Sequence, residues 1–246
     1  MRNTIILIPS RLNATRLPNK PLLKINNKSI INHVYEKALS TKIGDAYVAT
    51  GDQEIYNEVT KNGGKCILTQ KNHKTGTDRI FEAFQKLNDT KVQYVINLQG
   101  DEPMIDIEDV KNLHNKAINN KSEIATLACE IKNKTIYNKN DIVKVITEKK
   151  LTKDDTRKAK IFLREVSKNN IENTYHHIGI YIFEVSILKK FVSLEQTENE
   201  ISKKLEQLRA MDNNISIDVN LANTSPIGVD TKEDYLEIKK LMEYKI

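Results

Sequence analysis

The sequence predicts an α/β protein built on a mostly parallel sheet. Three short apolar runs, at residues 4–8, 45–50 and 94–98, alternate with longer amphipathic stretches. Strands buried on both faces of a parallel sheet have near-continuous apolar sequences, and parallel neighbours are joined by helical crossovers. The alternation therefore indicates repeated βαβ units. A chain of 246 residues is long enough to bury one large core.

The elements of the first half have their own local signals. A helix is expected at residues 29–40, where Ser29 is the candidate N-cap and Ile30 and Val34 share one face. Gly63 and the glycine after it are typical of a helix C-terminus. The other expected elements are strands at residues 45–50, 65–69 and 94–98 and helices at residues 52–62, 77–88 and 106–119.

After residue 120 the pattern changes to strands with little helix between them. Strands are expected at residues 124–131, 142–148, 159–165 and 176–183, with polar loops at residues 148–160 and 166–174. We expect a β-rich lobe of approximately residues 124–183 inside a single domain of residues 1–246. The chain returns to helix near residues 197–212 and ends with a helix at residues 231–244, where Thr231 and Asp234 predict a capping box.

Composition limits the class of partner. The formal net charge is +6, but the 39 Lys and Arg are interspersed with 33 Asp and Glu, and Trp is absent. Nucleic acid is therefore not an expected partner, because no basic patch is interleaved with aromatic residues that would stack on bases. Membrane insertion is not expected either, because no stretch approaches the roughly 20 apolar residues of a membrane helix.

Two cysteines, Cys66 and Cys129, lie in apolar strand-like runs. Two thiols are too few for a disulfide framework or a four-thiolate zinc site, so both are expected to be buried and inert. The N-terminus also lacks the apolar run and small-residue cleavage site of a secretory signal. A cytoplasmic location is expected. His73 is expected at the surface, since no partner suggests a metal site.

The loop after the first strand reads IPSRLNATRLPNKPL and combines three cations with three prolines. Ligands of open parallel sheets bind beyond the carboxyl ends of the strands, which selects the loops at residues 9–21, 69–77 and 99–105. Arg11, Arg16 and Lys20 in a stiffened loop are suited to holding a polyphosphate. The alternative is an ordinary solvated basic loop. Neither G-x-G-x-x-G nor the Walker A pattern occurs in the chain.

Two acidic residues are candidate metal ligands. Asp101 follows the strand at residues 94–98 in the sequence QGDEP. Mg²⁺ is typically held by one or two carboxylates together with phosphate oxygens, so this position suits it. The alternative for Asp101 is a turn or helix-capping acid. Asp230, in the sequence GVDT, reads by itself as a turn residue.

Six segments in this order resemble one family, the 3-deoxy-manno-octulosonate (Kdo) cytidylyltransferases, or CMP-Kdo synthetases. They are IPSRLNATRLPNKPL, HKTGTDR, NLQGDEPMI, HIGIY, EQLR and GVDTKED. The resemblance implies a GT-A-like nucleotidyltransferase core with an inserted β-rich dimerisation lobe. It further implies a homodimer that joins CTP and Kdo to give CMP-Kdo and pyrophosphate, with Mg²⁺ as cofactor, for lipopolysaccharide biosynthesis.

The resemblance also implies roles for individual residues. The triphosphate cations would be Arg11, Arg16 and Lys20, and the Mg²⁺ ligands Asp101 and Asp230; these five form the expected catalytic set. Nucleotide binding would use Pro9, Ser10, Arg11, Lys20, Thr75, Arg79 and Gln99. The sugar acid would be bound by Arg164, His177, Tyr181, Glu206 and Gln207. The family's usual Ser-Arg is Leu163-Arg164 here and the following proline is missing, so the departures lie mainly on the sugar side.

Two alternatives stay open at this point. The first is CMP transfer to a related keto acid, either 8-amino-Kdo or a sialic acid. The CMP-sialic acid synthetases share the arginine-rich first loop, but their usual form has Lys-Arg where this sequence has Thr15-Arg16. The second is a non-catalytic nucleotide-binding paralogue. That reading predicts damage at the metal and phosphate positions, yet all five expected catalytic residues are present.

Overall fold

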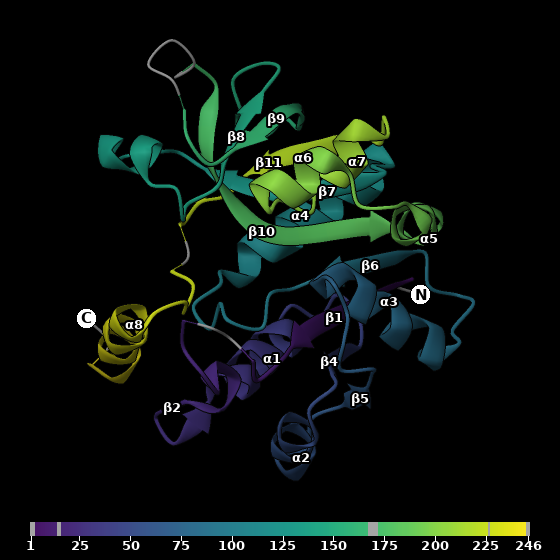
Figure 1. Ribbon diagram of the computed structural model, residues 1–246, viewed down its shortest axis with the longest axis vertical. Coiled ribbons are helices and arrows are strands. Elements are labelled where there is room, and N and C mark those ends of the chain that lie inside the picture. Colours follow the sequence, from purple (N-terminus) through teal and green to yellow (C-terminus); the bar gives the residue numbers. More distant parts are fainter. Residues whose placement is uncertain (1–2, 14–15, 167–171, 226, 245–246) are drawn as a thin grey trace. The chain divides into compact units, whose positions relative to one another are not determined.

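A computed structural model of the chain describes residues 3–13, 16–166, 172–225 and 227–244 (Figure 1). The chain divides into two compact units, which we call unit 1 (Met1–Val110 with Pro226–Ile246) and unit 2 (Lys111–Ser225). Thr15 and residues 167–171 of the expected loop at 166–174 lie outside the described residues.

Four strands of unit 1 pair in parallel, in the order β5-β4-β1-β6. Their bounds are β1 Thr4–Ser10, β4 Ala46–Thr50, β5 Cys66–Leu68 and β6 Tyr94–Asn97. The apolar β1 lies between two partners, with Ile6 opposite Ala46 on one side and Ile96 on the other. Ile6, Leu7 and Ile8 are fully buried, which confirms that this run is covered on both faces.

Helices connect these strands as expected, namely α1 Ile30–Ser40, α2 Gln53–Lys61 and α3 Gly76–Leu87. The expected helix after β6 is α4, Ile107–Asn120. Gly63 has a φ of 77° after α2, a left-handed conformation that favours glycine. Ser29 occupies the N-cap position of α1, but its buried hydroxyl makes no capping hydrogen bond. The expected cap is therefore confirmed in position but not in its interaction.

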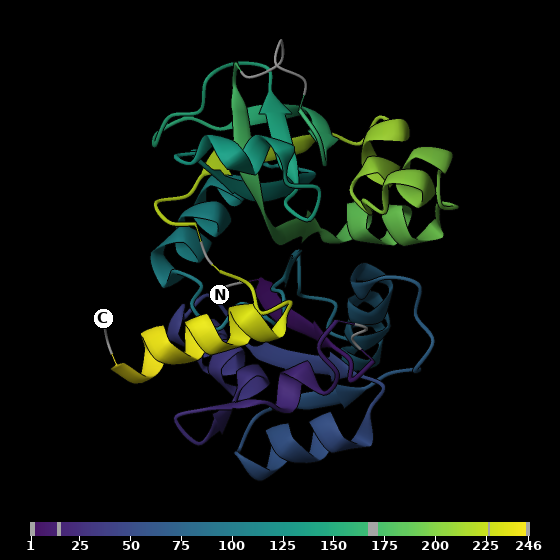
Figure 2. The same cartoon turned by 60° about the vertical axis from the view of Figure 1, so that its left-hand side comes forward.

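The C-terminal helix α8, Lys232–Tyr244, returns to unit 1. It lies beside the short hairpin of β2 (Lys24–Ile25) and β3 (Lys28–Ser29), as Figures 1 and 2 show. Ile238 of α8 packs in a buried cluster with Ile25, Ile30 and Val229. The Tyr235 hydroxyl also donates to the Lys24 carbonyl oxygen at 2.7 Å. These contacts attach α8 to the hairpin and to the start of α1.

Unit 2 is rich in strands and its sheet is mixed. The strands are β7 Ile124–Cys129, β8 Lys144–Thr147, β9 Arg157–Leu163, β10 Thr174–Glu184 and β11 Ile217–Leu221. Their order is β10-β7-β11-β9-β8, and β8 also pairs with β10. Among the described strands of unit 2, only β7 and β11 pair in parallel. The expectation of a mostly parallel sheet therefore holds for unit 1 and not for unit 2.

Several elements of unit 2 were not predicted. Strand β11 was missed although its sequence, IDVNL, alternates apolar and polar residues as a half-buried strand does. Helix α5, Val185–Ser193, was also missed, and the region expected to be helical near residues 197–212 contains two short helices, α6 Glu198–Lys203 and α7 Leu208–Asp212. The described residues also form the short 3₁₀-helices η1, Lys20–Leu22 in unit 1, and η2, Lys134–Asn138 in unit 2.

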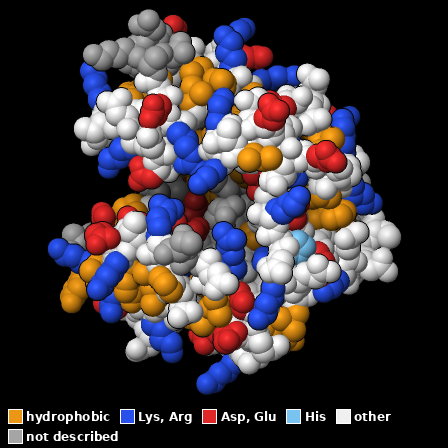
Figure 3. All heavy atoms as spheres, viewed as in Figure 1, with side chains coloured by type: hydrophobic (Ala, Val, Ile, Leu, Met, Phe, Trp, Pro, Cys, Tyr) orange, Lys and Arg blue, Asp and Glu red, His pale blue; other side chains and the backbone are white. Residues whose placement is uncertain are grey.

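The surface agrees with the composition, and of the two cysteines expected to be buried only Cys129 is fully so. On the face shown in Figure 3, Lys and Arg are interspersed with Asp and Glu. None of the helices described is both long and apolar enough to cross a membrane. Cys129 is buried in β7 and Cys66 is half-buried in β5, where burial raises the pKa of the thiol to about 12.

Candidate active site

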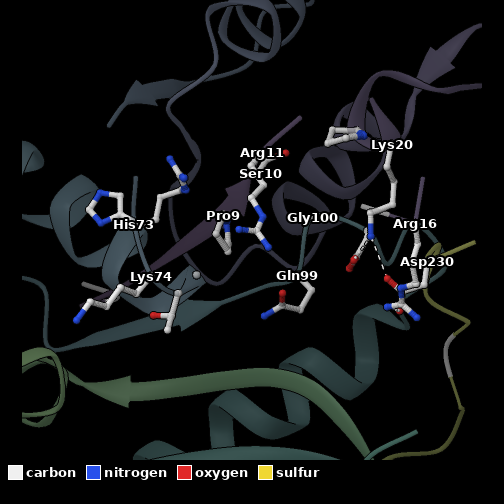
Figure 4. A pocket seen from close by; sticks show the side chains of 15 residues that line it. Pro9, Ser10, Arg11, Arg16, Lys20, His73, Lys74, Gln99, Gly100 and Asp230 are labelled. Atoms are coloured by element: carbon white, nitrogen blue, oxygen red, sulfur yellow. Dashed lines mark hydrogen bonds and ion pairs between the residues drawn. The ribbon is translucent and has the colours of Figure 1, made fainter. Parts of the chain in front are cut away.

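A cavity of about 320 Å³ lies in unit 1, beyond the carboxyl ends of β1 and β6 (Figure 4). The three loops selected from the sequence, at residues 9–21, 69–77 and 99–105, all contribute to its wall. This is the arrangement expected of parallel neighbours, whose carboxyl ends meet at one edge of the sheet. Every unit 1 residue named for catalysis or nucleotide binding lines it: Pro9, Ser10, Arg11, Arg16, Lys20, Thr75, Arg79, Gln99, Asp101 and Asp230.

Lys20 joins the two predicted metal ligands. Its Nζ is 2.6 Å from Oδ2 of Asp101 and 3.2 Å from Oδ1 of Asp230. Burial alone would lower the pKa of Lys20, but the two carboxylates outweigh it and the pKa is raised. Arg16 adds a second cation, with Nη2 3.0 Å from Oδ2 of Asp230. Figure 4 shows Arg16, Lys20 and Asp230 at one side of the cavity, with His73 at the other side and Gln99 between them.

Asp230 reaches Asp101 because the backbone joins the two segments. The Val229 N–H donates to the Asp101 carbonyl oxygen at 2.9 Å, and Val229 is fully buried. The capping box of α8 then orients the next residues, since the Asp234 carboxylate accepts from the N–H groups of Asp230 and Thr231 at 3.0 and 2.7 Å. Local sequence indicates a turn residue at Asp230, whereas in the structure it lies in the irregular segment before α8 and lines the cavity.

The acidic end of the cavity has a donor set suited to Mg²⁺. Asp101 and Asp230 converge on one ammonium group, so both can face a common cation. Glu102, the residue after Asp101, does not line the cavity, and its buried Oε2 has no hydrogen-bond partner among the described residues. Burial, and then the charges of Asp101 and Asp230, raise the pKa of Glu102 to about 8. In the described part of the chain, no group of three or more His, Cys, Asp or Glu is arranged to hold a metal ion.

Helix α3 begins at the opposite side of the cavity. Its N-terminus is closed by a capping box, in which the Thr75 hydroxyl and the Asp78 carboxylate each accept the other residue's backbone N–H at 3.1 Å. Arg79 lines the cavity, but its guanidinium is already occupied. It donates to the Thr69 hydroxyl at 2.7 Å and to the carbonyl oxygens of Gln70 and Lys71 at 3.0 Å each.

Sequence reasoning missed some residues of the wall. His73, Lys74, Gly76, Gly100 and Pro21 also line the cavity. His73 was expected at the surface, and this was wrong: its side chain is only 16% exposed, with Nε2 2.5 Å from a carboxylate oxygen of Glu82. A signal was present, because His73 stands two residues before the Thr75 cap in the same HKTGTDR segment.

Unit 2 carries the predicted sugar-acid residues. His177 and Tyr181 of β10 are in ring contact, with centroids 5.4 Å apart, and Phe162 contacts His177 at 5.1 Å. Burial lowers the pKa of His177 to about 3, so the imidazole is neutral near pH 7. The buried Tyr181 hydroxyl has no hydrogen-bond partner among the described residues. The neighbouring His176 instead contacts the Ser225 hydroxyl through Nδ1 at 3.1 Å.

Arg164 makes different contacts from those expected. Its Nε and Nη2 donate to the carbonyl oxygens of Lys203 and Lys204 at 2.9 and 3.0 Å, and Nη1 donates to that of Asn140 at 2.9 Å. The bonds to Lys203 and Lys204 attach Arg164 to the segment just before Glu206 and Gln207. The structure therefore gives Arg164 a structural contact, and its binding to a sugar carboxylate stays a prediction.

Comparison with known proteins gives the family. The sequence model of the cytidylyltransferase family matches residues 5–217. The chain is 43% identical to a 3-deoxy-manno-octulosonate cytidylyltransferase of Thermodesulfovibrio yellowstonii over 243 residues, covering 94% of each chain. It is 37% identical to the enzyme of the same name from Rickettsia bellii (strain OSU 85-389), covering 98% of this chain and 97% of that one.

Two solved structures are similar to this chain over nearly its whole length. The structure of a CMP:2-keto-3-deoxy-manno-octonic acid synthetase complexed with CTP has a TM-score of 0.88 at 34% identity, with 99% of each chain covered. A UDP-glucose pyrophosphorylase complexed with UDP-glucose has a TM-score of 0.70 at 14% identity, covering 99% of both chains. The second likeness shows the fold alone, an α/β nucleotidyltransferase-like fold with a mixed sheet. The chain belongs to the cytidylyltransferases, and within them to the family of 3-deoxy-manno-octulosonate cytidylyltransferases.

Proposed function

We propose that this protein transfers CMP from CTP to the anomeric hydroxyl of Kdo, giving CMP-Kdo and pyrophosphate. The observation that carries the proposal is the cavity of unit 1, where three cations of one loop meet two carboxylates from distant segments. A site of this kind matches a nucleoside triphosphate, which presents many negative oxygens and needs a divalent cation. Membership of the family supplies the identities of the base and the sugar acid.

In the proposed reaction the anomeric oxygen attacks the α-phosphorus in line. The new oxygen–phosphorus bond forms as the bond to the bridging oxygen of the β-phosphate breaks, and the hydroxyl proton passes to water. Such transfers depend on positioning and charge neutralisation. Arg11, Arg16 and Lys20 would bind the triphosphate and neutralise the departing pyrophosphate. Asp101 and Asp230 would hold Mg²⁺, which when bound neutralises phosphate charge and lowers the pKa of a coordinated hydroxyl.

Residues of unit 2 would recognise the sugar acid. The Tyr181 hydroxyl is buried and has no partner among the described residues, so a sugar hydroxyl would satisfy it without displacing a protein group. His177 is neutral near pH 7 because burial lowers its pKa, and it would act as a hydrogen-bonding group without charge. Gln207 is 9% exposed at the start of α7 and, with Glu206, would contact further hydroxyls.

We also propose that the protein is a homodimer formed through the β-rich lobe and works in the cytoplasm for lipopolysaccharide biosynthesis. These statements rest on the family resemblance and on no contact described above. Sedimentation equilibrium of the purified protein would test the dimer, since a mass of 28.2 kDa at all concentrations would contradict it.

The proposed reaction predicts Kdo-dependent release of pyrophosphate from CTP. We expect release with CTP, Mg²⁺ and Kdo together, and loss of release when Kdo is omitted or EDTA removes the metal. Release with 8-amino-Kdo or a sialic acid but not with Kdo would keep the chemistry and change the acceptor. No release with any acceptor, while CTP still binds, would favour a nucleotide-binding paralogue.

Arg164→Ala is expected to raise the KM for Kdo about tenfold while the KM for CTP changes less than twofold. The reason is that three charged hydrogen bonds are lost, two of them to the backbone just before Glu206, and each such bond contributes about 1.5–3 kcal/mol. Steady-state kinetics with each substrate varied in turn measures the effect. Arg157→Ala is the matched control, because Arg157 begins β9, the strand that ends just before Arg164, and its guanidinium pairs with Asp155. An unchanged KM for Kdo would contradict a role for Arg164 at the sugar site.

A further inference from the structure

The loop at residues 69–74, between β5 and α3, forms part of two cavities. His73 and Lys74 line the cavity of about 320 Å³ described above, and both also line a neighbouring cavity of about 570 Å³. Gly76, the first residue of α3, also lines the first of these cavities, and a Cβ added there would be 3.4 Å from Cγ of Pro9. A shift of this loop would therefore change the shape of the proposed nucleotide site.

One carboxylate holds both halves of this loop. Glu82 on α3 accepts the Gln70 backbone N–H, at 3.0 and 3.2 Å from its two oxygens. Its Oε2 is also 2.5 Å from Nε2 of His73. Burial alone would raise the pKa of Glu82, but its bonds with Lys86, the Gln70 N–H and His73 lower it to about 2. Glu82 is thus a fixed anion near neutral pH, and it lines neither cavity itself.

The same face of α3 supports the rest of the loop. Arg79, three residues before Glu82, donates to three oxygens of residues 69–71. Lys86, four residues after Glu82, donates to the Leu68 carbonyl oxygen at 2.6 Å and pairs with Oε1 of Glu82 at 2.8 Å. Positions three and four apart share a helix face. Glu82 lies in the middle of this row and is the only one of the three that accepts hydrogen bonds from the loop.

We propose that Glu82 is a positioning residue for the nucleotide, holding Gln70 and His73 so that the loop at residues 69–74 is preorganised for CTP. The inference rests on the proposed function and extends it to a residue outside the cavity. Preorganisation lowers the ordering cost of binding, so loss of the carboxylate raises the KM for CTP. The contacts of Glu82 all lie within unit 1, whereas the predicted sugar-acid residues lie in unit 2, so the KM for Kdo is expected to stay unchanged.

Glu82→Gln tests the proposal, because it keeps the side-chain size and one acceptor oxygen but removes the charge. We expect the KM for CTP, and its Kd measured by calorimetry with Mg²⁺, to rise about tenfold, the loss expected for one charge-assisted hydrogen bond. The kcat and the KM for Kdo should remain within about twofold. A raised KM with an unchanged kcat is the result of losing an interaction that stabilises the ground state and the transition state equally. A purely structural role would instead lower the fraction of active protein and leave the KM for CTP unchanged.

Glu123→Gln is the matched control. Glu123 is a carboxylate of unit 2 whose side chain accepts from the N–H and hydroxyl of Ser216 at 2.9 and 2.7 Å. Burial alone would raise the pKa of Glu123, but these bonds outweigh it and the pKa is lowered. It resembles Glu82 in interaction but lies outside the proposed site. We expect a similar loss of thermal stability in the two variants and a change in the KM for CTP only in Glu82→Gln.

A second variant covers the case in which Glu82→Gln does not fold. His73→Leu removes one donor to Glu82 and leaves the backbone bond from Gln70, so we expect the KM for CTP to rise about threefold. His73→Gln should recover part of the lost CTP affinity, because its side-chain amide can donate in place of Nε2. An unchanged KM and Kd for CTP in a folded variant would overturn the inference while wild-type turnover still supports the proposed function. A wild-type protein that neither binds nor turns over CTP would instead overturn the proposed function.

Discussion

Asp101→Asn is expected to lower kcat at least about a hundredfold while CTP still binds. Asp101 is both a proposed Mg²⁺ ligand and the partner of Lys20 at 2.6 Å. Asparagine keeps the shape but removes the negative charge that attracts a divalent cation, and loss of even an indirect metal contact typically costs 10–100-fold in affinity or activity. The cations of the first loop are untouched, so the Kd for CTP should change far less than kcat.

The measurement is pyrophosphate release at saturating CTP and Kdo over a range of Mg²⁺ concentrations, with CTP binding followed by calorimetry. Asp106→Asn is the matched control. Asp106 lies five residues further along the chain and accepts the Glu108 backbone N–H at 2.8 Å at the start of α4. Asparagine caps a helix about as well as aspartate, so this variant should keep its activity. Near-normal turnover in Asp101→Asn would refute the assignment of Asp101 as a metal ligand.

Arg209→Met is expected to lower the free energy of unfolding by about 3–5 kcal/mol, because it leaves the Glu200 carboxylate buried without its cation. Nε and Nη2 of Arg209 bond to the two oxygens of Glu200 at 2.8 and 2.6 Å, and the two side chains are 2% and 3% exposed. The guanidinium also lies over the Phe191 ring, 4.6 Å from its centroid. This pair joins α6 to α7 on either side of Glu206 and Gln207.

Urea denaturation of the purified protein measures the loss, and the double variant Arg209→Met with Glu200→Met separates charge from packing. Replacing both partners removes the isolated charge, so most of the stability should return. Lys65→Met provides the comparison, because Lys65 and Asp45 form an ion pair at 2.8 Å with side chains 52% and 60% exposed. Such surface pairs contribute about 0–1 kcal/mol. A loss below about 1 kcal/mol in Arg209→Met would show that the buried pair is not needed for folding.

Much of unit 1 follows from local sequence. The apolar run that forms β1 and the glycine signal after α2 each specify an element through their own burial pattern or backbone freedom. The loops at the carboxyl ends of β1, β5 and β6 are predictable as a site from the βαβ pattern, because parallel topology places those ends at one edge. Position and charge therefore identify Arg11 and Lys20, and both line the cavity.

Unit 2 was less predictable from its sequence. The short strand β11 was missed because its alternating pattern covers only five residues, Ile217–Leu221, which is a weak signal. Its pairing partners are β7 and β9, which are distant in the chain. The role expected for Arg164 came from the family alone, and the structure shows its donors on backbone carbonyls that no local pattern indicates.

By itself, the sequence determined the βαβ order, the loop of cations and the candidate acid Asp101, because helix periodicity, strand burial and loop position are local properties. Only the tertiary structure decided which groups pair: Asp230 with Lys20, Glu82 with His73, and Arg209 with Glu200. The partner of a charged side chain depends on which segments the fold brings within a few ångströms, and Lys20 and Asp230 lie at opposite ends of the chain. The cavity and its electrostatics are therefore properties of the folded chain, although most of its residues can be named from the sequence.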